Sequence, residues 1–349
     1  MKLTEGKREL WVDEVKLFAC ALVALGHMLA GLTPSGILRE TDAFVWFVNS
    51  INLFHVPLFF ICSGYLYQRR SRIDTPKKWI RNVGYKFLAL GVPYLTFSLL
   101  SWLLKVVLSS AVNNAVEEPL WRILLNDPIQ QYWYLYALAL LFLITPTFKR
   151  VRGLVCVFAV AVAARIVYES ETVTTSVRIV PYILKNEIWF TGGMLLAILR
   201  VPEKIRGRRL LPAGIALWGL FILTTLTEKS RQCSYSDFAE AFFACAATLL
   251  TVLSIREGDK LRSCVSRLSP YTFPVYLMHT FFAAATRILL IKLKVLSAPA
   301  HLAVGLVASF AGPVLLMKLM EKLKYPVFFV YPNRFLRREK KRQTTDTVI

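Results

Sequence analysis

Apolar residues run along most of this chain in long blocks, separated by short polar segments that are mostly basic. Ten of these blocks are long enough, or nearly long enough, to cross a bilayer as a helix. They lie at about residues 15–31, 44–67, 83–108, 132–147, 150–168, 188–200, 210–227, 237–255, 271–291 and 299–321. The blocks that begin at Tyr132 and Ile188 are short for a span, so we expect them to be tilted, re-entrant or extended into their flanks. The pattern predicts an all-α, polytopic integral membrane protein with about ten transmembrane helices.

Composition supports a membrane protein and excludes several enzyme classes. The 349 residues are 56% hydrophobic, with a mean hydropathy of +0.50, whereas soluble domains need more polar surface. The six cysteines form no paired motif, so we expect neither a disulfide framework nor a metal site. The sequence also has no GxGxxG, Walker, GxSxG or HExxH motif, which removes the dinucleotide, P-loop, serine-hydrolase and zinc-protease classes.

The basic residues behind the formal charge of +21 are concentrated in alternate segments between the apolar blocks. Alternate inter-helix segments, beginning with the N-terminal one, hold 29 Lys and Arg residues, and the intervening segments hold 8. By the positive-inside rule both termini are cytoplasmic and the number of spans is even. The charge therefore implies contact with anionic membrane lipids and no nucleic-acid partner. We divide the chain into a transmembrane domain, residues 1–332, and a basic cytoplasmic tail, residues 333–349.

Two ionisable residues interrupt the first apolar block. Lys16 and His27 are eleven residues apart, which is almost three helical turns, so both side chains project from one face, about 16 Å apart along the axis. A charged group within the bilayer is costly and is by default a functional candidate that faces a cavity. The topology places Lys16 at the cytoplasmic mouth and His27 deep in the membrane. Alternatively, Lys16 extends its ammonium group to the lipid headgroups without a function.

Further polar residues fall at a similar depth. Asn52 and His55 lie in the second block, and His279 lies in the ninth, all in the middle third of the membrane. A histidine in a membrane helix is often only an interhelical hydrogen-bond partner, and that alternative stays open for His55 and His279. His301 opens the last block at the outer face, where we expect it to have no special role.

Arginines cluster where the second block meets the cytoplasm, in the segment SGYLYQRRSR at 63–72. Arg69, Arg70 and Arg72 offer fork-shaped donors that suit phosphate oxygens. Loops that obey the positive-inside rule look similar without binding anything, so both interpretations remain. The phosphate-binding interpretation is favoured by Lys16, which lies on the same side of the membrane. Among catalytic groups, a buried neutral imidazole is the remaining candidate, because it can act as a base near neutral pH.

Four of the apolar blocks carry motifs in a set order. They are WVDEVKLFACALVALGHML, NLFHVPLFFICSGYLYQRR, WYLYALALLFLI and SPYTFPVYLMHTFF. In this order they resemble the acyltransferase-3 family of membrane acyltransferases, whose signature is a basic residue, ten intervening positions and a histidine. Lys16 and His27 fit that signature, although many members carry arginine at the first position. The first block is most similar to the fucose 4-O-acetylase-like branch of the family.

The resemblance implies O-acylation, usually acetylation, of a cell-surface or lipid-linked carbohydrate by cytoplasmic acyl-CoA, at the plasma membrane of a bacterium. Arg69 with Arg72 matches the Arg-x-x-Arg element of the family, and His279 matches its Tyr-Leu-x-His ending. Lys16, Arg69, Arg70 and Arg72 are then expected to hold the anionic end of CoA.

His27 is expected to deprotonate the acceptor hydroxyl or to carry the acyl group itself. Asn52, His55 and His279 are candidates to orient His27 or to stabilise the oxyanion. Acetyl-CoA is the donor substrate in this account, and no metal is required.

A rival class is a transporter or flippase of a glycan or a related small molecule, in which intramembrane ionisable residues form a path for protons or substrate. The chain has no visible internal repeat and no matching pair of broken helices, which are typical of that class. A sensor or scaffold protein has no dedicated soluble module here. The acceptor, the acyl chain length and the oligomeric state are not specified by the sequence.

Overall fold

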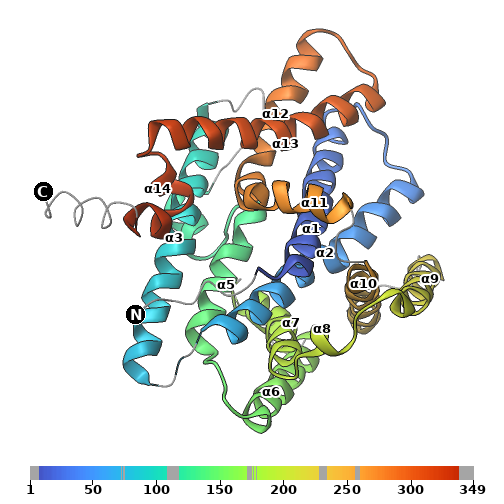
Figure 1. Ribbon diagram of the computed structural model, residues 1–349. Helices are drawn as coiled ribbons and strands as arrows, with labels where there is room; N and C mark the ends of the chain where they lie inside the picture. Colours follow the sequence, from blue (N-terminus) through green and yellow to red (C-terminus); the bar gives the residue numbers. More distant parts are fainter. Residues whose placement is uncertain are drawn as a thin grey trace, which may run out of the picture.

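The helical class predicted from the sequence is confirmed. The computed structural model describes residues 8–71, 73, 75–107, 118–170, 175, 177, 179–227, 234–255 and 260–337, and within them all regular secondary structure is helical (Figure 1). Eight helices of this part are long and apolar enough to cross a membrane. They are α1 (Leu10–Leu32), α2 (Asp42–Arg70), α3 (Pro76–Val107), α6 (Val151–Glu169), α9 (Leu211–Thr227), α10 (Ser234–Ser254), α12 (Thr272–Lys292) and α13 (Ala298–Leu323).

The remaining two apolar blocks are the ones whose length was short for a span. The block from Tyr132 forms α5 (Trp133–Ile144), a helix of 12 residues that follows a 3₁₀ turn at Gln130–Tyr132. The block from Ile188 is extended into its upstream flank and forms α7 (Ile179–Ile198). All ten blocks are therefore helical, whereas the number of complete crossings and the side of each terminus stay predictions.

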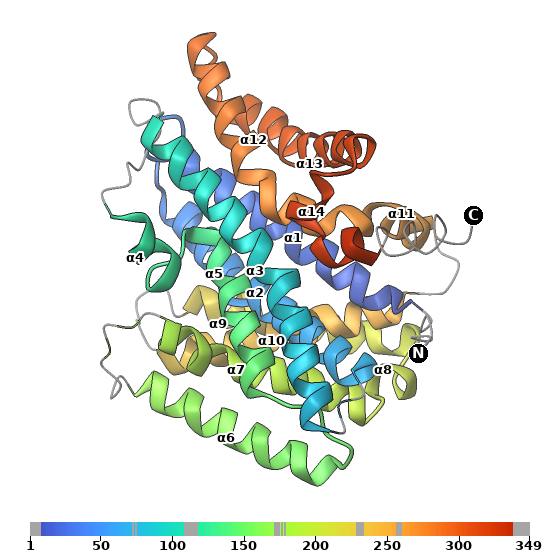
Figure 2. The same cartoon turned by 90° about the vertical axis from the view of Figure 1, so that its left-hand side faces the viewer.

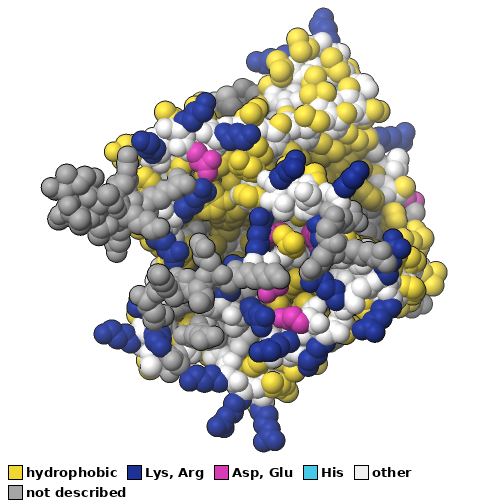
Figure 3. Space-filling view, in the orientation of Figure 1, with side chains coloured by type: hydrophobic (Ala, Val, Ile, Leu, Met, Phe, Trp, Pro, Cys, Tyr) yellow, Lys and Arg dark blue, Asp and Glu magenta, His cyan; other side chains and the backbone are white. Residues whose placement is uncertain are grey.

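Short helices lie at the two ends of the bundle. The end where α1 begins and α2 finishes also carries α8 (Val201–Lys204), α11 (Lys260–Leu268) and α14 (Val327–Val330), and we call it the basic end. In Figure 3 the face that includes α8 and α11 shows many more Lys and Arg side chains than Asp and Glu side chains. The opposite end carries α4 (Leu120–Leu125). Of the predicted tail, residues 333–337 are helical, and the rest lies outside the described residues.

Helices α1 and α2 lie at the centre of the bundle, whereas α6 lies at its edge and α12 and α13 project from it as a pair (Figures 1 and 2). In the most apolar stretch of α2 50% of the residues are buried inside the protein, against 17% in α6 and in α9. The exposed apolar surface of the outer helices suits lipid, which is as apolar as a leucine side chain.

The central pair, α1 and α2, is antiparallel and its register is fixed by contacts along its length. At the basic end Trp11 packs edge-on against Tyr65, with ring centroids 4.7 Å apart. One turn before Tyr65 on α2, the Cys62 thiol points to the carbonyl oxygen of Val12, 4.0 Å away. Near the other end of α1, Gly26 faces the side chain of Asn52. This register places the middle of α2, with its polar residues, beside the second half of α1.

Helix α2 also crosses α7 at very close range through a pair of glycines. A Cβ atom at Gly64 would collide with the carbonyl oxygen of Phe190, and one at Gly193 would collide with that of Ile61. Small residues permit such close backbone contact between membrane helices, where van der Waals packing replaces the hydrophobic driving force. The two glycines therefore fix α7 against α2.

A buried ion pair holds α11 against the start of α1. Arg262 and Glu14 lie 2.8 Å apart, with side chains that are 3% and 5% exposed, and Arg262 also donates to the Val252 carbonyl oxygen of α10. Removing one partner from a buried pair leaves an uncompensated charge, which is strongly unfavourable. The contact therefore stabilises the packing of α11 against the basic ends of α1 and α10.

Substituting alanine at the glycine crossing should destabilise the protein. Gly193→Ala forces the two backbones apart, which we expect to cost about 1–3 kcal/mol and to lower the unfolding temperature of the purified protein in detergent. Gly91→Ala is the matched control, because a Cβ atom at Gly91 meets nothing within 4 Å. The control should be neutral or slightly stabilising, since alanine is the better helix former. Equal unfolding temperatures for the two variants would contradict the close crossing.

Candidate active site

The polar residues predicted within the membrane meet in one cavity. His27 of α1 and Asn52 and His55 of α2 line a cavity of about 450 Å³. Segments from the α4–α5 region, α7 and α12 complete its wall. The other lining residues are Val23, Val56, Phe59, Asp127, Pro128, Gln131, Trp133, Tyr134, Tyr182 and Tyr276. The structure thus brings three of the four predicted catalytic candidates to one surface.

One stripe of α1 presents His27 to the cavity. Lys16, Cys20, Val23 and His27 follow one another at helical spacing along one face of this unbroken helix. Val23 and His27 line the cavity, Cys20 is fully buried, and Lys16 lies outside the lining. Because α1 is an unbroken helix, Lys16 and His27 lie on one of its faces, as predicted. Of the two residues, only His27 lines the cavity.

The fourth candidate, His279, packs directly against His27. The two rings are tilted by 41° with centroids 5.3 Å apart. His279 is fully buried, and its Nδ1 lies 3.0 Å from the carbonyl oxygens of Val275 and Tyr276 in its own helix. Because a carbonyl oxygen only accepts, Nδ1 carries the proton, and Nε2 of the neutral ring is an acceptor without a hydrogen-bond partner.

His55 has the same protonation pattern. Its Nδ1 donates to the Ile51 carbonyl oxygen at 2.7 Å, which leaves Nε2 as an acceptor on the neutral ring. A neutral imidazole held in this way can accept a proton or a hydrogen bond at Nε2 but cannot donate one there. Of the residues predicted to stabilise an oxyanion, only Asn52 has donors for the purpose, through its exposed side-chain amide.

Aromatic rings line the side of the cavity that is nearer the basic end. Phe59, Tyr134 and Tyr276 pack together with centroid distances of 5.6 to 6.0 Å. The Tyr134 hydroxyl group pairs with that of Ser63 at 3.0 Å, and the Tyr276 hydroxyl group donates to the Gln131 carbonyl oxygen. We call the three rings the aromatic floor. It lies between His27 and the part of α1 that carries Lys16.

A second pair of aromatic rings forms a side wall of the cavity. Trp133 and Tyr182 stack with centroids 4.5 Å apart and an angle of 21°. Asp127, which precedes α5, lines the same cavity. Sequence reasoning did not single out Tyr182 or Asp127. The hydrophobic block beginning at Tyr132 and the motif WYLYALALLFLI within it pointed to this region.

The predicted arginines at the basic end separate into different environments. Arg69 pairs with Glu203 at 2.8 Å and with Glu9 at 3.7 Å, so its charge is balanced. Arg70 is exposed at the end of α2. Arg72 lies outside the described residues.

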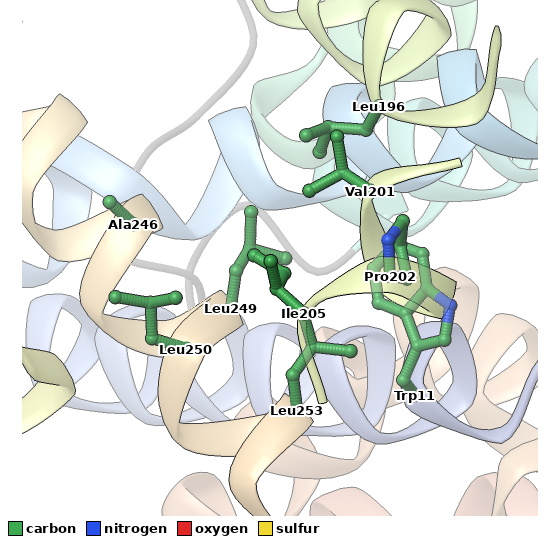
Figure 4. A pocket seen from close by; sticks show the side chains of 9 residues that line it. All are labelled: Trp11, Leu196, Val201, Pro202, Ile205, Ala246, Leu249, Leu250 and Leu253. Atoms are coloured by element: carbon green, nitrogen blue, oxygen red, sulfur yellow. The ribbon is translucent and has the colours of Figure 1, made fainter. Parts of the chain in front are cut away.

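A smaller cavity of about 170 Å³ lies between α1, α8 and α10 (Figure 4). Its lining is apolar, from Trp11 of α1 to Leu249, Leu250 and Leu253 of α10, and offers no group for acid–base chemistry. In the described part of the chain no group of three or more His, Cys, Asp or Glu side chains has the geometry of a metal site.

A bundle of apolar helices around a cavity lined by imidazole side chains defines a membrane protein whose cavity holds groups capable of acid–base chemistry. Residues 9–318 match the model of the acyltransferase-3 family, described as an acyltransferase domain. The chain therefore belongs to this family. Membership implies an acyl donor and an acceptor substrate.

Two curated relatives share part of the chain. A nodulation protein NolL of Mesorhizobium japonicum is 32% identical over 165 residues, which is 45% of this chain and 42% of the relative. A nodulation protein NolL of Sinorhizobium fredii is 27% identical over 199 residues, which is 55% of this chain and 50% of the relative. The chain thus spans about half the length of these relatives or less. No solved structure matches it.

Chemical modification should separate the histidines by their access to the cavity. Diethyl pyrocarbonate reacts with accessible neutral imidazole, so we expect it to modify His27, which is partly exposed, well before His279 and His301, which are fully buried. Mass spectrometry of the digested protein measures each site. Modification of His279 as fast as His27 would contradict the packing described here.

Proposed function

We propose that this protein is a membrane O-acyltransferase that transfers an acetyl or other short acyl group from cytoplasmic acyl-CoA to a hydroxyl group of a cell-surface or lipid-linked carbohydrate. The observation that supports this best is the contact between His27 and His279 at the edge of a cavity that His55 and Asn52 also line. Acyl transfer to a hydroxyl group needs a base for the proton and a donor for the oxyanion, and this cavity holds both.

His27 is the general base in this mechanism. It takes the proton of the acceptor hydroxyl as the oxygen attacks the thioester carbonyl, and it returns the proton to the sulfur of CoA as the C–S bond breaks. His279 positions His27, because its Nε2 can accept the N–H of the His27 ring and thereby leaves the other His27 nitrogen free as a base. A variant of this mechanism, in which His27 carries the acyl group between two transfers, uses the same geometry.

Asn52 and His55 act on the reacting groups from α2. The Asn52 amide can donate to the oxyanion that forms at the thioester carbonyl. His55 presents an acceptor, so it suits a second hydroxyl group of the acceptor molecule better than an oxyanion.

The donor enters from the basic end. Lys16 and Arg70, with Arg69 and Arg72 in the predicted set, hold the phosphates of CoA, and the roughly 16 Å between Lys16 and His27 suits the pantetheine arm. The aromatic floor lies across this path, so its rings must move aside for the acyl group to reach His27. In the topology predicted from charge, the basic end faces the cytoplasm of a bacterial cell and contacts its anionic lipids.

The acceptor occupies the side of the cavity that carries Trp133, Tyr182 and Asp127. Flat aromatic faces present apolar surface to the C–H groups of a sugar ring, and a carboxylate accepts hydrogen bonds from its hydroxyl groups. This mixed lining supports a carbohydrate more than a purely apolar acceptor.

Replacing His27 should reduce transfer strongly without removing the protein from the membrane. Loss of a general base typically costs 10²–10⁴-fold in rate, so His27→Ala should reduce transfer by roughly a hundredfold or more. Purified protein in nanodiscs, radiolabelled acetyl-CoA and a panel of lipid-linked or polymeric glycans provide the assay.

The control is His301→Gln, at a buried histidine whose Nε2 bonds the Val295 carbonyl oxygen at the far end of α13 from the basic end. This variant should keep the activity of the unmodified protein. Full activity of His27→Ala would refute the assignment, and glycan movement across the bilayer without acyl transfer would favour a transporter instead.

A further inference from the structure

A lysine that sequence reasoning did not select lies next to two of the predicted donor-binding residues. Lys86 of α3 is close enough to Lys16 of α1 and Arg70 of α2 for the three charges to act on one another. Three helices thus bring three cations within electrostatic range of one another. We call Lys16, Arg70 and Lys86 the cationic cluster.

Aromatic side chains hold Lys86 in this position. Its ammonium group lies 4.4 Å from the ring centroid of Phe142 in α5 and 5.9 Å from that of Tyr67 in α2. Cation–π contacts of this kind fix the direction of a lysine without neutralising its charge. Tyr67 and Arg70 are three residues apart on α2 and share a face, so the ring that contacts Lys86 also brings Arg70 to its side.

The carboxylates near the cationic cluster pair with other arginines. Asp13 acts on Lys16 through its charge, but its carboxylate pairs with Arg8 at 2.5 Å. Glu9 and Glu203 pair with Arg69. Among the residues that the structure describes, no ion pair joins a carboxylate to any member of the cationic cluster.

Like charges that converge in a partly buried place repel one another, and an anion placed among them relieves that repulsion. We propose that Lys86 completes, with Lys16 and Arg70, a binding site for phosphate groups, and that these belong to the acyl-CoA donor. The inference rests on the proposed function for the identity of the donor. It adds to the predicted set a residue from a different helix, whereas the charge of Arg69 is already balanced by Glu203.

The number of cations in the cluster favours a diphosphate over a single phosphate. CoA carries a diphosphate and a further phosphate, which can engage several cations, whereas a phospholipid headgroup brings one phosphate and must stay at the bilayer surface. Both sources share the same chemistry, so the experiment must separate them.

The test compares Lys86→Met with Lys105→Met, which removes a lysine from the other end of α3, away from the cationic cluster. The full-length protein is placed in nanodiscs of phosphatidylcholine alone, and binding of pyrophosphate and acetyl-CoA is measured by thermal stabilisation. Lys86→Met should weaken binding of both roughly tenfold, as expected for a lost charge-assisted contact. Lys86→Arg should retain binding, and Lys105→Met should behave as the unmodified protein.

Acetyl transfer gives a second readout. S-Acetylpantetheine carries the thioester arm without phosphates, so Lys86→Met should raise the KM for acetyl-CoA roughly tenfold and leave the kinetics with S-acetylpantetheine unchanged. An unchanged KM for acetyl-CoA together with unchanged pyrophosphate binding would overturn the proposal.

The outcomes also separate this inference from the proposed function. If Lys86 governs pyrophosphate binding but no protein form binds acetyl-CoA or transfers acetyl groups, the phosphate site stands and the proposed donor is wrong. Addition of phosphatidylglycerol to the nanodiscs tests the lipid source. If that lipid stabilises the unmodified protein but not Lys86→Met, while neither pyrophosphate nor acetyl-CoA does, the assignment to the donor is overturned.

Discussion

The antiparallel packing of α1 against α2 is the constraint on which the site depends. Inside a bilayer no hydrophobic force drives two apolar helices together, so close van der Waals packing and a few polar contacts must set their register. Contacts from Trp11 with Tyr65 at one end to Gly26 with Asn52 at the other hold that register along the whole pair. As a result His27 faces the polar middle of α2, and Lys16 lies beneath the aromatic floor.

This arrangement separates the chemistry of the site along one helix. Cations lie toward the basic end, aromatic rings line the neighbouring side of the cavity, and imidazoles lie beyond the rings. The hydrogen bonds of His55 and His279 to carbonyl oxygens of their own helices fix where each ring can accept a proton. The proposed transfer uses this order, because the charged donor and the uncharged reacting groups need environments of opposite polarity.

Much of this could be predicted from sequence because it is encoded locally. Hydrophobic block length identifies the helices, and the helical period places Lys16 and His27 on one face. The same reasoning identified His55 and Asn52, since polar residues in apolar blocks stand out. The short block from Tyr132 was also recognised as unusual, and it forms the 12-residue helix that contributes Trp133 and Tyr134 to the cavity.

The remaining features depend on contacts between distant segments. His279 meets His27 across roughly 250 residues of chain, and Glu203 balances Arg69 from a short helix that has no sequence signal of its own. Lys86 looks like an ordinary basic residue near the start of the third apolar block until the rings of Tyr67 and Phe142 are seen around it. Such partners are set by helix packing, which the period of a single block does not report.

A structure of the purified protein with CoA bound tests the central claim most directly. The account predicts that the phosphates of CoA contact the cationic cluster, and that its thiol reaches past a displaced aromatic floor to within hydrogen-bonding distance of His27. CoA bound elsewhere, or a His27 ring that faces lipid while CoA is bound, would contradict it.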